Sequence, residues 1–263
     1  MLLKDKVLII SGIGPGLGVK LAVEAAREGA KGLVIAARGT DKLDDAEKRV
    51  RELGVTCKIV KVPTDISVPA QCKNLVEVAM KEFGRIDALI NSAYFHGNSE
   101  PIMGGDLELW KTAFNTNVIG SVELSRAVAP HMAAQGGGAI VIVNTMATMK
   151  PLGGEAGYAI SKGALTTATK YLAAELGPQN IRVNATRMGW MWGVPVQTGL
   201  QMMADAQGLK LEDVAAGIAQ NIALRRIVTD DECSRSVLFL ASDYASAVSG
   251  AILDVNGGEY IPS

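Results

Sequence analysis

Short stretches rich in valine and isoleucine alternate with longer amphipathic stretches along the chain. Several short stretches are apolar without alternation, which is typical of parallel strands that are covered on both faces. We expect strands at Lys6–Ser11, Gly32–Ala37, Thr56–Val62, Ile86–Asn91, Ala139–Asn144, Arg182–Ala185 and Ala251–Val255. We expect helices at Leu17–Glu28, Lys42–Leu53, Ala70–Phe83, Leu107–Ala134, Tyr158–Leu176 and Asp231–Ala241. This order predicts the α/β class, with a doubly wound parallel sheet of about seven strands and helices on both faces.

Glycines mark the ends of several predicted helices. Gly29 and Gly54 each follow a helix, and Gly177 with Pro178 follows another, as is common at helix C-termini. No linker, repeat or change of composition divides the chain, so we expect one domain over residues 1–263. The least regular segment is 189–210, which is rich in methionine, glycine and tryptophan. Since long irregular insertions often cover a substrate, we expect a lid over about residues 189–215.

The composition excludes several classes of function. With a net charge of −1, the chain has no basic field that would bind nucleic acid. No run approaches the ~18 apolar residues of a membrane span, and the apolar N-terminal stretch is too short for a signal peptide. Three cysteines without metal-like spacing favour a reduced protein, and two histidines are too few to build a metal site. We therefore expect a cytoplasmic protein with no metal, nucleic acid or membrane partner.

A glycine-rich turn follows the first predicted strand and precedes the first predicted helix. Gly12, Gly16 and Gly18 permit a tight turn and close backbone approach, and the helix N-terminus attracts a pyrophosphate. The spacing is Gly-x-x-x-Gly-x-Gly rather than Gly-x-Gly-x-x-Gly. A flexible surface turn is the alternative interpretation, but the position between a strand and a helix favours a dinucleotide site.

The end of the second predicted strand bears on the choice of cofactor. A carboxylate there would bind the adenosine ribose hydroxyls and select NAD(H). The strand instead ends in Ala37, followed by Arg38, whose guanidinium can bind a 2′-phosphate with two hydrogen bonds. The sequence favours NADP(H), with NAD(H) as the alternative if Arg38 is an ordinary solvated turn residue.

Tyr158 and Lys162 carry the strongest chemical signal. Positions i and i+4 of a helix share one face, so the phenol and the ammonium can occupy one site. A tyrosine titrates near ~10, and a close cation favours the phenolate by about one to three pKa units. This brings the phenol toward the range for proton exchange with a carbonyl or carbinol oxygen. Without further context, Tyr-x-x-x-Lys would be a surface pair.

From Lys4 to about Gly258 the chain resembles the short-chain dehydrogenase/reductase family, which has a Rossmann-type fold. The family's Thr-Gly-x-x-x-Gly-x-Gly turn is matched here with Ser11 in the threonine position. Its serine at the end of the fifth strand falls on Thr145, which keeps a hydroxyl. Its helical asparagine falls on Asn117, in an Asn-Val-x-Gly setting.

The resemblance implies a catalytic set of Tyr158, Lys162, Thr145 and Asn117. Tyr158 would be the acid/base, and Lys162 would lower its pKa and bind the nicotinamide ribose. Thr145 would orient the carbonyl oxygen, and Asn117 would hold a water in a proton relay to the lysine. Taken singly, Asn117 could be a satisfied helix polar group and Thr145 a strand-end hydroxyl.

The resemblance also implies cofactor contacts, including an aspartate, Asp65, at the adenine amino group. The expected contacts are Ser11, Gly12, Pro15, Gly16, Leu17, Gly18, Arg38, Asp65, Ile66, Asn91, Ser92, Ala93, Tyr158, Lys162, Gly189 and Met191. The chain departs from the family at Tyr94, where a glycine is usual, and at Met188, where a proline is usual. Family members usually form homodimers or homotetramers through the helices that hold the asparagine and the tyrosine.

The side chains expected to face the substrate are mostly apolar and include no arginine pair. They are Tyr94, Phe95, His96, Met146, Met149, Trp190, Met191, Trp192, Met202 and Met203. They favour an apolar or cyclic ketone or secondary alcohol, although packing of a lid or an interface is the alternative. His96 is expected to be a loop residue there rather than a catalyst. The sequence thus predicts an NADP(H)-dependent oxidoreductase, with an enoyl-thioester reductase or a non-catalytic nucleotide-binding regulator as alternatives.

Overall fold

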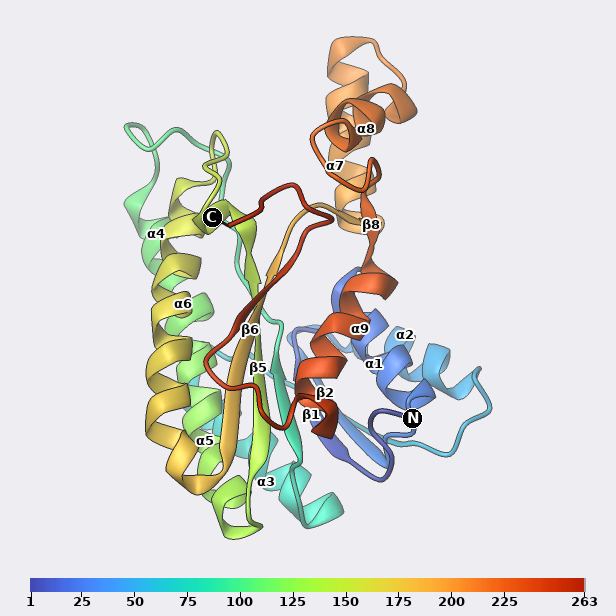
Figure 1. Ribbon diagram of the computed structural model, residues 1–263, viewed down its shortest axis with the longest axis vertical. Helices are drawn as coiled ribbons and strands as arrows, with labels where there is room; N and C mark the ends of the chain where they lie inside the picture. The colour runs from blue at the N-terminus through green and yellow to red at the C-terminus, as the bar shows by residue number, and fades with distance from the viewer. Residues whose placement is uncertain (263) are drawn as a thin grey trace.

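The computed structural model describes residues 1–262, and its centre is a parallel sheet in the order β3-β2-β1-β4-β5-β6-β9 (Figure 1). The strands are β1 (Val7–Ser11), β2 (Gly32–Ala37), β3 (Lys58–Pro63), β4 (Ala88–Asn91), β5 (Gly138–Thr145), β6 (Ile181–Met188) and β9 (Ile252–Val255). Each strand pairs with its neighbours in parallel. The seven predicted strands are confirmed, with ends that differ by at most three residues.

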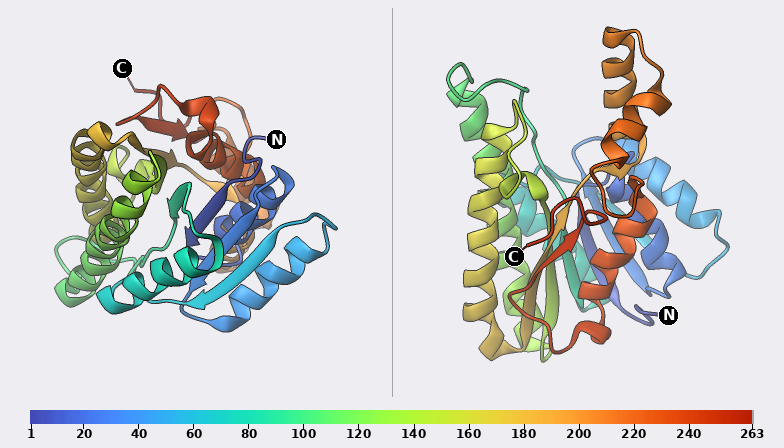
Figure 2. Two further views of the ribbon diagram at one scale, coloured as in Figure 1. Left: turned by 90° about the horizontal axis from the view of Figure 1, so that it is seen from below. Right: turned by 45° about the horizontal axis from the view of Figure 1, so that its top comes forward.

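Helices cover both faces of the sheet, as Figure 2 shows in the view from below. One face carries α1 (Leu17–Arg27), α2 (Thr40–Arg51) and α9 (Asp230–Ala241), and the other carries α3 (Pro69–Phe83), α5 (Ser121–Ala134) and α6 (Ala156–Leu176). Because successive side chains of a strand point to opposite faces, Leu8 and Ile10 join the first core and Ile9 joins the second. The doubly wound α/β prediction is therefore confirmed. Within residues 1–262 no helix is long and apolar enough to cross a membrane.

The helix predicted over 107–134 is not one continuous α-helix. It consists of α4 (Leu107–Phe114), a π-helical segment η1 (Asn115–Gly120) and α5. A Cβ at Gly120 would lie 2.6 Å from the Ile66 carbonyl oxygen, so the backbone passes close to the loop after β3. Hydrophobic periodicity does not distinguish a π-turn from an α-turn, and π-helical segments occur frequently at functional sites. Short 3₁₀ turns complete the helical elements: η2 (Met146–Thr148), η3 (Gly177–Gln179) and η4 (Asp243–Ala245).

The segment predicted to be irregular, 189–210, is mostly helical. It contains β7 (Met191–Trp192) and α7 (Val194–Gln207) and is followed by α8 (Leu211–Ala219), and β7 pairs with β8 (Val228–Thr229). The prediction was wrong because Leu200 and Ala204, one turn apart, form a buried stripe that glycine and methionine obscure in the sequence. The α7–α8 pair extends beyond the carboxyl end of the sheet (Figures 1 and 2), and its action as a lid stays a prediction.

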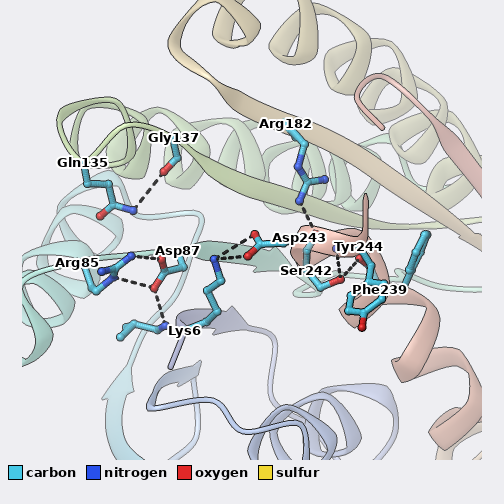
Figure 3. A network of polar contacts seen from close by, with 11 residues as sticks. Lys6, Arg85, Asp87, Gln135, Gly137, Arg182, Phe239, Ser242, Asp243 and Tyr244 are labelled. Atoms are coloured by element: carbon cyan, nitrogen blue, oxygen red, sulfur yellow. Dashed lines mark hydrogen bonds and ion pairs between the residues drawn. The ribbon is translucent and has the colours of Figure 1, made fainter. Parts of the chain in front are cut away.

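The amino end of the sheet holds a network of paired polar groups (Figure 3). Arg85 Nε donates to Asp87 Oδ2 at 3.0 Å, and the same oxygen accepts the Val7 N–H at 2.8 Å. Arg182 donates to the Leu240 and Ser242 carbonyl oxygens at 3.0 and 2.9 Å, which satisfies the C-terminus of α9. The opposite, carboxyl end includes the switch point between β1 and β4, where open α/β sheets bind ligands.

Candidate active site

A cleft of about 820 Å³ opens over the carboxyl ends of the strands. One part of its wall comes from the glycine-rich turn after β1 and the residues that follow β2. Another part comes from the loop after β4, the end of β5 and the start of α6, and the segment that leads into α7 completes it. The cleft therefore joins the predicted cofactor region to the predicted catalytic residues.

The glycine-rich turn packs too tightly for side chains at two of its positions. Gly12 has a φ of 88°, and a Cβ there would overlap the Ala93 nitrogen. A Cβ at Gly18 would overlap the Gly12 carbonyl oxygen. The N-cap of α1, Gly16, makes no side-chain cap, and the first turn of the helix contains no acidic residue. The first N–H groups of α1 thus face the cleft without a side-chain anion, which fits the pyrophosphate of a dinucleotide.

Two cationic side chains line the cleft beyond β2. Arg38 is exposed at the end of the strand, and Lys42 lies in the first turn of α2. Asp65 lies near them, and its carboxylate accepts the Ser67 N–H at 2.9 Å and the Ser67 hydroxyl at 2.6 Å. These two bonds hold the pKa of Asp65 below its usual value, and the charge of Arg38 adds to the effect. Sequence reasoning missed Lys42, although its position one turn into the helix after Arg38 was a usable signal.

Tyr158, Lys162 and Thr145 come together in the cleft. Tyr158 and Lys162 lie one turn apart on α6, and the Lys162 Nζ is 5.8 Å from the centre of the tyrosine ring. Lys162 is buried and donates to the Val143 carbonyl oxygen at 2.8 Å. Thr145, the last residue of β5, accepts the Ala147 N–H at 3.2 Å. Three of the four residues of the predicted catalytic set thus lie together in the cleft, and their catalytic roles stay a prediction.

Burial controls the ionisation of both groups on α6. Burial raises the pKa of Tyr158, the neighbouring Tyr94 and the charge of Glu155 raise it further, and a hydrogen bond with Thr145 acts in the opposite direction. Burial lowers the pKa of Lys162 to about 7. The expected lowering of the tyrosine pKa by Lys162 is not present in this structure. The causes that shift this pKa are burial, Tyr94, Glu155 and Thr145, and Lys162 is not among them.

Asn117 lies in η1, is fully buried and does not line the cleft. Its side-chain amide accepts the Phe95 N–H at 2.7 Å and donates to the Phe95 carbonyl oxygen at 3.0 Å. It also donates to the Ser161 hydroxyl at 2.9 Å, and Ser161 donates to the Tyr158 carbonyl oxygen at 2.7 Å. The side chain therefore fixes the loop after β4 against α6, and the predicted water relay stays a prediction.

Most of the predicted cofactor contacts line the cleft. They are Gly12, Pro15, Gly16, Leu17, Gly18, Arg38, Asp65, Ile66, Ser92, Ala93, Tyr158, Lys162, Gly189 and Met191. Ser11 and Asn91 do not line it. The Ser11 hydroxyl lies 3.4 Å from the Asn91 side-chain oxygen, and Asn91 donates to the Ser125 hydroxyl at 3.1 Å. These two side chains are buried behind the strand ends, because parallel neighbours β1 and β4 place them against each other rather than toward the opening.

Seven of the ten side chains expected at the substrate line the cleft: Tyr94, Phe95, His96, Met146, Trp190, Met191 and Met203. Trp192 does not, because successive residues of β7 point to opposite sides and Met191 takes the side that faces the cleft. Met149 and Met202 do not line it either, and both are exposed.

Three residues lie close to Tyr158. His96 lies in the loop after β4, as expected, and its ring centre is 4.8 Å from that of Tyr158. Its Nε2 is 2.8 Å from Oε2 of Glu155, a residue that sequence reasoning missed. Glu155 precedes Tyr158 by one helical turn, so the i, i+3 spacing was the available signal. Tyr94, which departs from the family glycine, places its ring 6.0 Å from the Tyr158 ring.

Comparisons with known proteins give consistent results. A family model described as Enoyl-(Acyl carrier protein) reductase matches residues 12–259. Dehydrogenase/reductase SDR family member 4 of Caenorhabditis elegans is 32% identical over 259 residues, covering 97% of this chain and 95% of the relative. Peroxisomal 2,4-dienoyl-CoA reductase of Rattus norvegicus is 34% identical over 262 residues, covering 99% of this chain and 85% of the relative.

Solved structures resemble the fold over almost its whole length. The L-sorbose reductase from Gluconobacter frateurii, complexed with NADPH and L-sorbose, superposes with a TM-score of 0.93 at 29% identity, covering 99% of this chain and 98% of that one. A levodione reductase superposes with a TM-score of 0.91 at 28% identity, covering 98% of each chain. The similarity therefore extends to residues 189–215 and to both ends of the sheet.

Proposed function

The chain belongs to the short-chain dehydrogenase/reductase family of NAD(P)-dependent oxidoreductases, and from this premise we propose that it interconverts a ketone and a secondary alcohol with NADP(H). The convergence of Tyr158, Lys162 and Thr145 in one cleft with the glycine-rich turn carries the proposal. Membership of an oxidoreductase family also argues against the non-catalytic regulator that the sequence left open.

NADP(H), when bound, would supply the hydride for reduction and accept it in oxidation. The Thr145 hydroxyl and the Tyr158 phenol hold the substrate oxygen, and Tyr158 gives its proton to that oxygen during reduction. During oxidation the phenolate takes the proton back from the carbinol. The raised pKa keeps the proton on Tyr158 but also makes the phenol a weaker acid. The negative charge left on the phenolate in turn favours the charged form of Lys162.

The preference for NADP(H) is supported by Arg38 and Lys42. Both line the cofactor part of the cleft, and two cations suit a phosphate better than a ribose hydroxyl. In addition, the structurally similar L-sorbose reductase is complexed with NADPH.

We also propose a homodimer or homotetramer in which the face of α4, η1 and α6 is covered. Phe114, Ile119, Ile160 and Tyr171 lie on these elements and are each at least 42% exposed. Large apolar side chains are enriched at subunit interfaces. Light scattering at several protein concentrations tests this part of the proposal.

An enoyl-thioester reductase is the second candidate. The description of the matching family model and the 34% identity with a 2,4-dienoyl-CoA reductase favour it. The Tyr158–Thr145 pair favours the ketone instead, because its two hydroxyls can hold one oxygen atom that gains or loses a proton.

A substrate panel distinguishes the two candidates. The purified protein is offered ketones, secondary alcohols and crotonyl-CoA with each nicotinamide cofactor, and the absorbance of the reduced nicotinamide is followed. We expect turnover of ketones and secondary alcohols with NADP(H). Turnover of crotonyl-CoA alone would assign the second function, and absence of any turnover would contradict both.

A further inference from the structure

His96 and Glu155 form a close polar pair in the substrate part of the cleft. His96 comes from the loop after β4, and Glu155 is the N-cap residue of α6, one turn before Tyr158. Their closest atoms, Nε2 and Oε2, are 2.8 Å apart. The pair is open to the cleft, since 41% of the histidine side chain and 22% of the glutamate side chain are exposed.

The carboxylate of Glu155 has unused capacity for hydrogen bonds. Its Oε2 contacts His96, whereas its Oε1 receives no hydrogen bond from any of residues 1–262. A carboxylate offers about four acceptor positions, so several remain for a ligand. The other lining side chains nearby are mostly apolar, among them Met146, Leu152 and Trp190. An accessible acceptor therefore stands in an otherwise apolar wall.

The pair is not needed to anchor the loop after β4. The Asn117 amide already holds both backbone groups of Phe95, the residue next to His96. A partly exposed ion pair contributes only about 0–1 kcal/mol to stability. Anchoring therefore does not account for a carboxylate at this place.

Glu155 also does not assist the acid/base group. Its charge adds to the effects that raise the pKa of Tyr158, which makes the phenolate harder to form. Thr145 and Tyr158 already supply two hydroxyls for the substrate oxygen. The Glu155 carboxylate thus disfavours the phenolate and is still accessible from the cleft. We take this as an indication that it contacts another part of the substrate.

We propose that Glu155, oriented by His96, accepts a hydrogen bond from a hydroxyl on the carbon next to the reacting carbonyl, so that the substrate is an α-hydroxyketone or the corresponding vicinal diol. Glu155 Oε2 is 2.8 Å from His96 Nε2, and the His96 ring centre is 4.8 Å from that of Tyr158, so the carboxylate lies beside the place where Tyr158 meets the substrate oxygen. The same charge repels carboxylate and phosphate substrates. This inference rests on the proposed ketone chemistry and narrows its substrate class.

The test compares three ketones of related shape: cyclohexanone, 2-hydroxycyclohexanone and 2-methoxycyclohexanone. The methoxy compound has the size of a substituent but no O–H to donate. For the wild-type protein with NADPH, we expect kcat/KM to be about tenfold to a hundredfold higher for the hydroxyketone than for the methoxyketone, as for a hydrogen bond to a charged group.

Variants separate recognition from a structural role. Glu155→Met removes the acceptor and should bring the hydroxy-to-methoxy ratio close to one, mainly through KM, whereas Glu155→Gln keeps one acceptor oxygen and should retain part of the ratio. Glu77→Met is the matched control, because Glu77 lies on α3, is 60% exposed and does not line the cleft. It should leave the ratio unchanged.

Each other outcome has a definite meaning. Equal kcat/KM values of the wild type for the three ketones overturn the inference and leave the ketone chemistry standing. An equal loss on all three ketones in Glu155→Met also overturns it, because that loss indicates a structural role. If no ketone is reduced while crotonyl-CoA is, the proposed function and this inference both fail.

Discussion

At the amino end of the sheet Arg85 and Asp87 pair with each other, whereas at the carboxyl end the buried Lys162 has no carboxylate partner among residues 1–262. The two ends belong to the same seven strands and are covered by the same helices. The contacts of Asp87 stabilise the fold, since its carboxylate also accepts the first N–H of β1. Burial lowers the pKa of Lys162 to about 7, so keeping this lysine charged in the folded protein costs free energy.

This contrast distinguishes polar groups that stabilise the fold from polar groups that serve the proposed function. Removing one partner of a buried, hydrogen-bonded charge destabilises the native state, because the other partner is left uncompensated. A buried ionisable group without an opposite charge lowers stability and persists where catalysis requires it. Four variants test this assignment.

The largest effect is expected from Tyr158→Phe at the carboxyl end. Loss of the phenol proton should lower kcat by about a thousandfold or more, because general acid catalysis and the contact with the substrate oxygen are lost together. Cofactor affinity, measured by fluorescence titration, should change little. A kcat within tenfold of the wild type would remove Tyr158 from the chemistry.

The next effect is expected at the amino end. Asp87→Ala leaves the Val7 N–H and the Arg85 guanidinium without their acceptor and should reduce the free energy of unfolding by about 2–4 kcal/mol. Urea unfolding measures the loss. The kcat per folded molecule should stay unchanged, and a decrease in kcat at full folding would show that the two ends are coupled.

Lys162→Met should stabilise the cofactor-free protein while it abolishes turnover. The pKa of Lys162 is about 7 in the folded protein, whereas its ordinary value is 10.5. Between these two pH values the lysine therefore loses its proton when the protein folds. The cost is complete below pH 7 and disappears as the pH rises toward about 10. The variant should therefore be more stable than the wild type by on the order of 2 kcal/mol at pH 7, with a smaller difference at pH 10.

Urea unfolding of both proteins at the two pH values measures this difference. A variant that is less stable at pH 7, or a difference that grows with pH, would show that Lys162 is not held at a cost.

The smallest effect is expected from variants in the part of the cleft that is predicted to bind the cofactor. Arg38→Ser combined with Lys42→Ser should raise KM for NADPH by about tenfold to a hundredfold, because two charge-assisted contacts with the 2′-phosphate are lost. The KM for NADH should change little, and steady-state kinetics with each cofactor measure both values. Lys48→Ser is the control, as Lys48 lies on α2, is 76% exposed and does not line the cleft. Equal changes for the two cofactors would contradict the preference for NADP(H).

Features that depend on neighbouring residues could be predicted from the amino-acid sequence. Apolar stretches located the seven strands, and the i, i+4 spacing placed Tyr158 and Lys162 on one face of α6. The glycine spacing located the turn between β1 and α1, where only a residue without a side chain fits beside Ala93. These features follow from strand and helix periodicity and from backbone sterics, which act over a few residues.

Contacts between distant segments could be assigned only from the folded structure. Asn117 reaches Phe95, His96 reaches Glu155, and Ser11 and Asn91 turn away from the cleft because their strands are adjacent. Such contacts depend on the register of the sheet and on how the helices pack across it, and the local pattern of hydrophobic and polar residues contains neither. For the same reason, helix α7 could be assigned only in the folded chain, because its buried stripe is short. The same holds for Trp192, whose position outside the cleft the sequence did not predict.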